Sequence, residues 1–183
     1  MFYPVSMAVE RLDDLPSYPL PSGYSVRFYE PGDEEVWRKI QSAADRLNTI
    51  TGTLFDEQFG GDAARLASRQ CYLLAEGAGA IGTATAWYDR RHHGRAYGRI
   101  HWVALLPDWQ GRGLSKPLLS VVCRRLHSLG HRRAYLTTST GRPRALNLYL
   151  GFGFCPEIRG PSDIEAWKSI ESELKWPKGA GLR

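Results

Sequence analysis

The chain has 183 residues, of which 43% are hydrophobic, and this size and composition fit one domain with a single substantial core. No apolar run approaches the roughly 20 residues that a transmembrane helix needs, and the first residues lack the basic start and apolar core of a secretory signal. The formal net charge of +5 favours an anionic partner without choosing between nucleic acid, a membrane surface and a phosphorylated ligand.

The cysteines and histidines give no sign of a metal site. Cys71, Cys123 and Cys155 are odd in number, lie far apart and show no C-x-x-C spacing, so we expect reduced thiols and a cytoplasmic protein. No H-E-x-x-H or comparable ligand spacing is present, and we expect no metal. His92 and His93 stand in a basic stretch, residues 89–99, which we interpret as a solvated loop.

The first half of the chain predicts an arm, a strand, helices and a hairpin, in that order. Residues 1–22 are rich in proline and poorly periodic, which favours an arm lying on a single domain of residues 23–183. Residues 24–30 alternate like a strand, and Asp33 is placed to cap the helix that follows. Residues 53–70 predict one or two short helices broken at Gly60 and Gly61, and residues 71–89 predict a hairpin around a glycine turn.

The second half alternates strands and helices. Residues 98–107 are too apolar for a half-exposed strand, which predicts a central position in the sheet. A helix over 114–129, a strand over 132–139, a helix over 142–150 and a strand over 151–158 follow. A Ser162 to Glu165 capping box opens a last helix, 162–175, whose apolar face is a candidate homodimer surface. This order predicts a mixed sheet with helices on both faces.

The stretch from Gln110 to Ser115, QGRGLS, joins the central strand to the helix after it. The first N–H groups of a helix lack intrahelical partners and carry partial positive charge, and glycines allow a diphosphate to approach them. The dinucleotide pattern does not fit because the third glycine is missing, and there is no Gly-Lys-Ser/Thr. Taken by itself, the turn indicates either a phosphate site or a plain tight turn.

Two blocks around this turn carry a family resemblance. The sequence VALLPDWQGRGLSKPLL resembles the coenzyme motif of the GNAT superfamily of acyl-CoA-dependent N-acyltransferases, whose turn reads Gln/Arg-x-x-Gly-x-Gly/Ala, with Gln110, Gly113 and Ser115 at those positions. The later block RPRALNLYLGFGF is similar to a second family signature. The matching residues there are Ala145, Tyr149, Gly153 and Phe154. The resemblance extends over residues 24–158, about three quarters of the chain.

The resemblance implies a fold and an activity. The fold is of the α/β (α+β) class, with a mixed, mostly antiparallel six- to seven-stranded sheet. The activity is transfer of an acetyl group from acetyl-CoA to a primary amine of a small molecule or peptide, by direct attack in a ternary complex. The central strand and the next one are expected to splay apart around the pantetheine arm. The residues expected to bind the coenzyme are Val103, Ala104, Leu105, Gln110, Gly111, Arg112, Gly113, Leu114, Ser115 and Arg142.

Two residues are candidates for proton transfer. Tyr149 matches the family's general-acid tyrosine, which would supply the proton that the departing sulfur takes up. His101 lies on the central strand where some family members carry a histidine, and it is our candidate base; the alternatives are a water chain and a purely structural histidine. Asp56, Glu57, Trp87 and Tyr88 are candidates for the acceptor pocket, with surface or core positions as the alternative.

A non-catalytic protein is the competing interpretation. It would keep the fold, bind acyl-CoA as a ligand and contact nucleic acid through the basic loop. Tyr149 beside an intact turn favours the enzyme, and no helix-turn-helix signal or RNP-type aromatic motif supports nucleic-acid binding.

Overall fold

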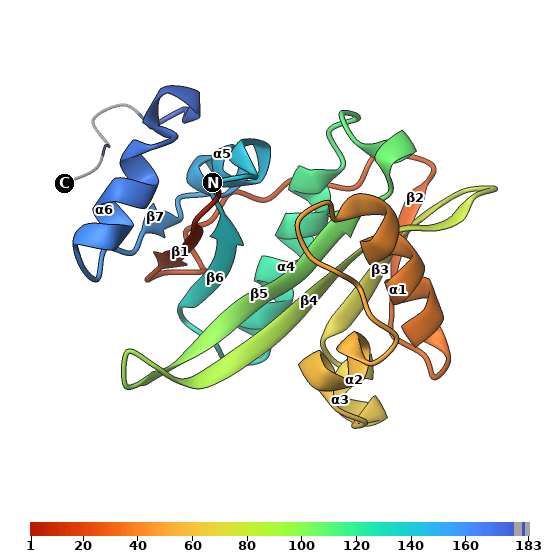
Figure 1. Ribbon diagram of the computed structural model, residues 1–183. Coiled ribbons are helices and arrows are strands. Elements are labelled where there is room, and N and C mark those ends of the chain that lie inside the picture. Colours follow the sequence, from red (N-terminus) through yellow and green to blue (C-terminus); the bar gives the residue numbers. More distant parts are fainter. Residues whose placement is uncertain (178–180, 182–183) are drawn as a thin grey trace.

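A seven-stranded sheet runs through the whole molecule in the computed structural model, which describes residues 1–177 and 181 (Figure 1). The spatial order of the strands is β2-β3-β4-β5-β6-β1-β7, and all neighbours are antiparallel except β5 and β6. The prediction of a mixed, mostly antiparallel six- to seven-stranded sheet is confirmed. The strands are β1 (Pro4–Val9), β2 (Tyr24–Phe28), β3 (Gln70–Ala75), β4 (Gly79–His92), β5 (Arg95–Leu105), β6 (Ala134–Ser139) and β7 (Cys155–Pro156).

Helices cover both faces of the sheet, as predicted (Figure 1). Side chains of β3 alternate between two apolar cores, because successive residues of a strand point to opposite faces. Cys71 and Leu73 join the core that contains side chains of α4, α5 and α6, whereas Tyr72 joins the core formed with α1, α2 and α3. The helices are α1 (Asp33–Ala44), α2 (Leu54–Phe59), α3 (Ala63–Ala67), α4 (Ser115–Ser128), α5 (Pro143–Gly151) and α6 (Pro161–Lys168).

The N-terminal residues do not form the predicted arm throughout. Residues 4–9 form β1, which is inserted between β6 and β7 and pairs with β6 at six positions. Val5, Ser6 and Met7 are all buried, so both faces of the strand are covered, and the one alternation of apolar and polar residues, Val5-Ser6-Met7, is too short to predict a strand. Leu12 is also buried, and its N–H donates to the carbonyl of Arg132. The start of the chain is therefore part of the core structure.

The last helix is shorter than predicted and begins differently. It ends at Lys168 and is followed by a short 3-10 turn. At its other end the N-cap is Gly160 and the first helical residue is Pro161, so the predicted capping box is absent. Ala166 and Trp167 are buried against the chain's own core. The apolar face that suggested a homodimer is already occupied within the chain.

Two further local predictions differ from the structure. Gly32 is the N-cap of α1, and Asp33, the first residue of the helix, accepts hydrogen bonds from the Glu30 N–H and the Arg27 guanidinium. The basic stretch 89–99 is the end of the long β4–β5 hairpin, with register pairing as far as His92 and Arg95. His92 is largely buried and contacts Glu157, so the interpretation of a solvated loop is wrong for this residue.

The described residues contain no helix with the length and apolarity needed to cross a membrane. Cys71 and Cys123 are buried, Cys155 is exposed, and all three are free thiols.

Candidate active site

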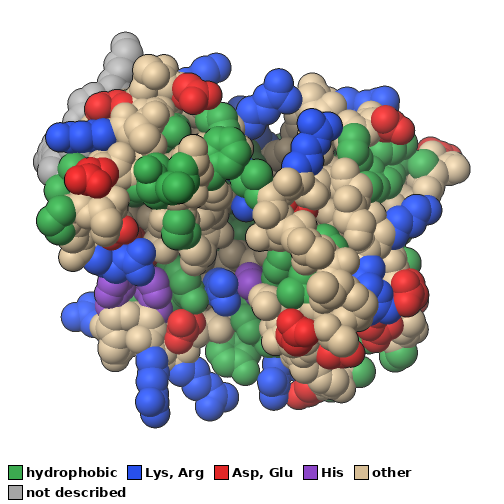
Figure 2. All heavy atoms as spheres, viewed as in Figure 1, with side chains coloured by type: hydrophobic (Ala, Val, Ile, Leu, Met, Phe, Trp, Pro, Cys, Tyr) green, Lys and Arg blue, Asp and Glu red, His purple; other side chains and the backbone are tan. Residues whose placement is uncertain are grey.

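The central strand β5 and its parallel neighbour β6 separate after a short region of pairing. Their register pairs are Gly98 with Ala134 and Arg99 with Tyr135. Over residues 100–105 the side of β5 that faces β6 has no strand partner in the described part of the chain. The space-filling view shows a hollow between the part of the molecule formed by α5 and α6 and the part formed by α1 (Figure 2). The predicted splay of the two strands is therefore present.

Backbone groups of β5 point into this gap. The Leu106 N–H donates to the carbonyl of Ile81 in β4, at 2.8 Å, and the antiparallel register pairs Leu105 with Gly82. Because hydrogen-bonded and non-bonded pairs alternate along an antiparallel ladder, the Leu105 N–H points away from β4, towards the gap. By the same alternation the Ala104 N–H faces β4, so of these two expected coenzyme contacts only Leu105 offers its N–H to the gap.

The glycine turn lies where β5 ends and α4 begins. Gly111 and Gly113 have φ angles of 76° and 78°, in the left-handed region that favours glycine, and a Cβ built on either would meet no atom within 4 Å. Within the described residues, none of the backbone N–H groups from Gly111 to Lys116 donates to a backbone carbonyl. The turn therefore combines N–H groups that have no backbone partner among the described residues with open space at both glycines, at the positive end of a helix, and this combination fits a diphosphate.

Side chains around the turn hold its shape. The Gln110 side-chain amide donates to the carbonyl of Leu105, at 2.9 Å, which ties the turn to the end of β5. The Arg112 guanidinium lies 4.6 Å from the centre of the Trp109 ring, and the Lys116 ammonium lies 5.0 Å from that of Tyr18. Both cations are close to the unpaired N–H groups in the sequence, so their charge adds to that of the helix terminus.

Tyr149 is placed on α5 in the larger core. Its side chain is 7% exposed, and its hydroxyl makes no hydrogen bond to another described residue. Burial raises the pKa of Tyr149 to about 12. The phenol therefore keeps its proton at neutral pH, and no described residue competes for it.

His101 lies beside a bulge in β5 that the sequence did not reveal. Trp102 has a φ angle of 50°, which is unusual for a bulky residue, and the register between β4 and β5 shifts at this point. The irregularity directs both neighbouring side chains to the same face: His101 contacts Phe59, and Trp102 contacts Trp37. The buried side chain of Gln41 donates to the Trp102 carbonyl, at 3.0 Å, and supports this backbone.

Gln58 determines which nitrogen of His101 carries the hydrogen. Its Oε1 accepts the Trp102 Nε1–H at 3.0 Å and lies 3.1 Å from His101 Nε2. An indole nitrogen can only donate, so Oε1 acts as an acceptor, and His101 Nε2 carries the hydrogen while Nδ1 keeps its lone pair. Burial, with a smaller contribution from Arg99, holds the pKa of His101 well below its usual value of 6.5. The imidazole is neutral at pH 7.

Arg142 is engaged in an ion pair that the sequence gave no reason to expect. Its Nη2 lies 2.7 and 2.8 Å from the two carboxylate oxygens of Asp45, a residue 97 positions earlier in the chain. Burial by itself would raise the pKa of Asp45, but hydrogen bonds from the Leu47 N–H, Asn48 and Arg142 outweigh it and lower that pKa. The pair joins the C-terminal end of α1 to the start of α5, on either side of the hollow.

The suggested acceptor residues fall into two groups. Asp56 and Glu57 are exposed on α2, whereas the Trp87 ring packs edge-on against Phe59 and is stacked on Tyr88. Trp87 therefore belongs to an aromatic cluster, between β5 and helices α1 and α2, that also includes His101. The other members of this cluster are Trp37, Phe55, Phe59 and Trp102.

The sequence did not predict that Gln41 and Gln58 belong to this site, because no sequence pattern distinguishes them from surface glutamines.

Comparisons with known proteins agree with this geometry. Residues 34–154 match the model of the acetyltransferase (GNAT) family. The mycothiol acetyltransferase of Pseudarthrobacter chlorophenolicus is 32% identical over 149 residues, covering 77% of this chain and 45% of that protein. The mycothiol acetyltransferase of Streptomyces coelicolor is 29% identical over 143 residues, covering 77% of this chain and 46% of that protein. The chain thus spans about half the length of the curated relatives that it matches.

Solved structures share the fold. A GCN5-related N-acetyltransferase from Sphaerobacter thermophilus superposes with a TM-score of 0.64 at 23% identity, over 84% of this chain and 48% of that one. An aminoglycoside N-acetyltransferase in complex with CoA gives a TM-score of 0.57 at 21% identity, over 78% of this chain and 95% of that one. The glycine turn, the separated strands and the matched family model together lead to one conclusion: the chain belongs to the acetyltransferase (GNAT) family.

Proposed function

We propose that this protein transfers an acetyl group from acetyl-CoA to the primary amine of a small molecule. The observation that carries the proposal is the glycine turn, with unpaired N–H groups and open space at Gly111 and Gly113, at the mouth of the gap between β5 and β6. The family match and the acetyltransferase relatives support the same activity.

The residues of the turn fit the coenzyme's pyrophosphate. The N–H groups from Gly111 to Ser115 would donate to the phosphate oxygens, and the charges of Arg112 and Lys116 would add to the attraction. The free edge of β5 at Val103 and Leu105 would pair with the amide groups of the pantetheine arm, as an added strand does. Arg142 would act indirectly, because its guanidinium is held by Asp45.

The chemistry that acetyl-CoA supplies is an activated thioester carbonyl. The acceptor nitrogen forms a bond to the carbonyl carbon, the bond from that carbon to sulfur breaks, and the sulfur leaves with the electron pair. The Leu105 N–H, directed into the gap, would stabilise the negative charge that develops on the carbonyl oxygen. Tyr149 would donate the proton that the departing sulfur takes up, since its phenol remains protonated at neutral pH.

The acceptor amine must lose a proton before or during attack. His101 is the proposed acceptor of this proton, because its imidazole is neutral and Nδ1 keeps a lone pair. Its low exposure, 8%, favours transfer through a short chain of water molecules rather than direct contact with the amine. The aromatic cluster around His101 would form the apolar wall of the acceptor site.

The non-catalytic alternative has no structural observation in its favour. The basic stretch assigned to nucleic-acid binding is the end of a regular hairpin. Tyr149, whose hydroxyl makes no hydrogen bond to another described residue, supports the enzyme instead.

The test is release of free thiol from acetyl-CoA in the presence of a panel of amines. The panel contains mycothiol-related amines, because the curated relatives are named mycothiol acetyltransferases, and also aminoglycosides, arylalkylamines, polyamines, amino acids and peptide N-termini. Acetylation of at least one small-molecule amine, confirmed by mass, is the expected result. Acetyl-CoA binding without turnover of any amine would favour the non-catalytic alternative instead.

A further inference from the structure

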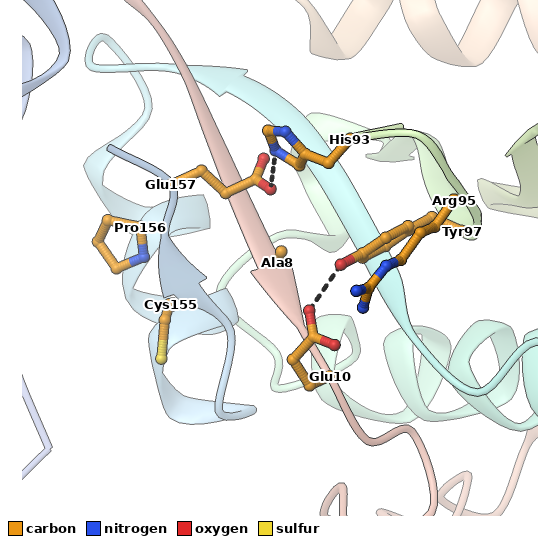
Figure 3. Close-up of a pocket in the computed structure, with 8 residues that line it drawn as sticks. All are labelled: Ala8, Glu10, His93, Arg95, Tyr97, Cys155, Pro156 and Glu157. Carbon is orange, nitrogen blue, oxygen red and sulfur yellow. Dashed lines mark hydrogen bonds and ion pairs between the residues drawn. The ribbon is translucent and has the colours of Figure 1, made fainter. Parts of the chain in front are cut away.

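Two histidines and a glutamate meet at the free end of the β4–β5 hairpin, away from the glycine turn. His92 is the last residue of β4, His93 begins the turn, and Glu157 directly follows β7. The Nε2 atoms of both histidines lie 2.9 Å from the same carboxylate oxygen, Oε1 of Glu157. Figure 3 shows His93 and Glu157, two of the residues that line a pocket, pointing towards one another.

The backbone is shaped so that both imidazoles reach the carboxylate. Successive residues of a regular strand point to opposite faces, which would separate two adjacent histidines. His93 instead has a φ angle of 48°, and the two ring centres lie 4.4 Å apart. Gly94 also has a positive φ angle, 73°, so His93 and Gly94 form the tight turn typical of a two-residue hairpin, and this turn brings the two imidazoles together.

Contacts with the rest of the fold hold two of the three residues, His92 and Glu157, in place. The His92 ring stacks on Tyr135, with 3.7 Å between ring centres and an interplanar angle of 13°. The Glu157 N–H donates to the carbonyl of Ser6, at 3.0 Å. The side chains of His92 and Glu157 are each 11% exposed, and that of His93 is 48% exposed. Two ligand positions are thus fixed, and the third is open to solvent.

We propose that His92, His93 and Glu157 form a binding site for a divalent transition metal ion, with Zn²⁺ as the best fit. Two imidazoles and a carboxylate are a common zinc ligand set, completed by water. The three ligand atoms all lie within 4.8 Å of one another. Zinc bonds of about 2.0–2.1 Å at tetrahedral angles place ligand atoms roughly 3.3 Å apart, so the carboxylate needs to withdraw by about 0.4 Å to admit the ion.

Besides the small withdrawal of the carboxylate, binding requires the Nε2 atom of each imidazole to present its lone pair to the ion. In the metal-free cluster Nε2 carries the hydrogen that Glu157 accepts. When that hydrogen moves to Nδ1, Nε2 presents its lone pair to the ion. The adjoining cavity, about 470 Å³ in volume, leaves room for water as a fourth ligand. Cys155 lines this cavity but is directed away from the Glu157 carboxylate, so three protein ligands are expected (Figure 3).

Charges around the cavity set the strength of binding. Arg95 lines it and opposes a cation, whereas Glu10, which accepts the Tyr97 hydroxyl at 2.6 Å, favours one. With one carboxylate among the ligands, we expect micromolar affinity for Zn²⁺ and little affinity for Mg²⁺, which prefers oxygen ligands.

The bound ion would cross-link the hairpin to β7. The hairpin turn and the glycine turn lie at opposite ends of β5, Arg95–Leu105, which at about 3.3 Å per residue are roughly 30 Å apart. The proposed site is therefore separate from the proposed chemistry and does not depend on it. Its effect would be to stabilise the edge of the sheet that includes β7, a strand of two residues.

The experiment measures Zn²⁺ binding to the whole chain, free of any polyhistidine tag and of metal. Calorimetry and equilibrium dialysis should give one Zn²⁺ per chain, and Co²⁺ should show the visible absorption of a tetrahedral site. Zn²⁺ should raise the Tm, because it binds only the folded arrangement. Mg²⁺ should neither bind nor raise the Tm. Absence of Zn²⁺ binding at about 100 μM, or equal binding of Mg²⁺, would overturn the proposal.

Variants locate the site. His93→Gln and Glu157→Gln should each weaken Zn²⁺ binding by at least about tenfold, whereas His127→Gln and Glu76→Gln, at exposed positions elsewhere, should not. Unchanged binding in the first pair would mean that the ion lies elsewhere. Far-UV circular dichroism of the metal-free variants checks folding. If Glu157→Gln unfolds, the half-exposed His93 provides the decisive comparison.

Discussion

Replacing Gly113 by alanine should separate binding of acetyl-CoA from folding. Gly113 has a φ angle of 78°, and a Cβ added there meets nothing within 4 Å. In the free protein the only cost is therefore that of the left-handed conformation, about 1–2 kcal/mol. That is a minor part of the 5–15 kcal/mol typical of a domain, so the variant should fold, with a Tm lower by roughly 2–8 °C.

The loss in affinity should be larger than the change in stability suggests. The new methyl group would occupy the open space in front of the unpaired N–H groups of the turn. Losing one charge-assisted hydrogen bond to a phosphate costs about 1.5–3 kcal/mol, which corresponds to a roughly 10- to 100-fold higher Kd. Calorimetric titration with acetyl-CoA measures the Kd, and thermal unfolding without ligand measures the Tm.

Gly130 provides the matched control. It has a φ angle of 85°, an added Cβ there also meets nothing within 4 Å, and it lies beyond the other end of α4. Gly130→Ala should therefore lower the Tm as much as Gly113→Ala and leave the Kd for acetyl-CoA unchanged. Parental affinity in folded Gly113→Ala would refute the assignment of the turn to the pyrophosphate. Equal losses of affinity in both variants would assign the effect to α4 as a whole.

Three further predictions concern proton transfer and the bulge. Tyr149→Phe keeps the ring but removes the proton, and it should lower kcat by roughly 10- to 1,000-fold with little change in the Kd for acetyl-CoA; a parental kcat would assign the acid to water. Gln58→Leu removes the acceptor shared by His101 and Trp102 and should cost about 1–3 kcal/mol in chemical denaturation, and no loss would contradict the contacts described. The pKa of His101 is lowered in the folded state, so the unfolded chain takes up a proton below pH 6.5 that the folded chain does not. The free energy of unfolding should therefore fall between pH 7 and 5, and it should fall less in His101→Gln; identical slopes would show that His101 does not contribute.

Much of the fold follows from local sequence patterns. The apolar repeat of α4 was predicted to within one residue at each end, and β5 was predicted as a central strand over 98–107, against Arg95–Leu105 in the structure. Both predictions rest on burial, on one face of a helix or on both faces of a strand. The first strand escaped prediction because its alternation, Val5-Ser6-Met7, spans three residues only and stands in a proline-rich segment. The last helix was predicted too long because its later apolar residues, Ile170 and Leu174, are buried outside the helix, on either side of a 3-10 turn.

The residues of the candidate site also divide into those that the sequence suggested and those that only the structure shows. Gly111, Gly113 and Tyr149 were identified from motifs, because a turn with left-handed glycines and a helix position seven residues into α5 are local features. The role of Arg142 was not, because its partner Asp45 lies 97 residues away. The tautomer of His101 likewise depends on Gln58, 43 residues earlier, and on a strand irregularity at Trp102 that no propensity predicts.

The sequence by itself determined the class of fold, the order of its elements and the glycine turn that presents N–H groups to a ligand. These are fixed by periodicity and by the conformational freedom of single residues, both of which act within a few positions along the chain. Only the tertiary structure decided where β5 and β6 part, which carboxylate holds Arg142 and that Glu157 meets His92 and His93. Contacts between segments 65 or 97 residues apart depend on how whole elements pack, and packing leaves no periodic trace in the sequence.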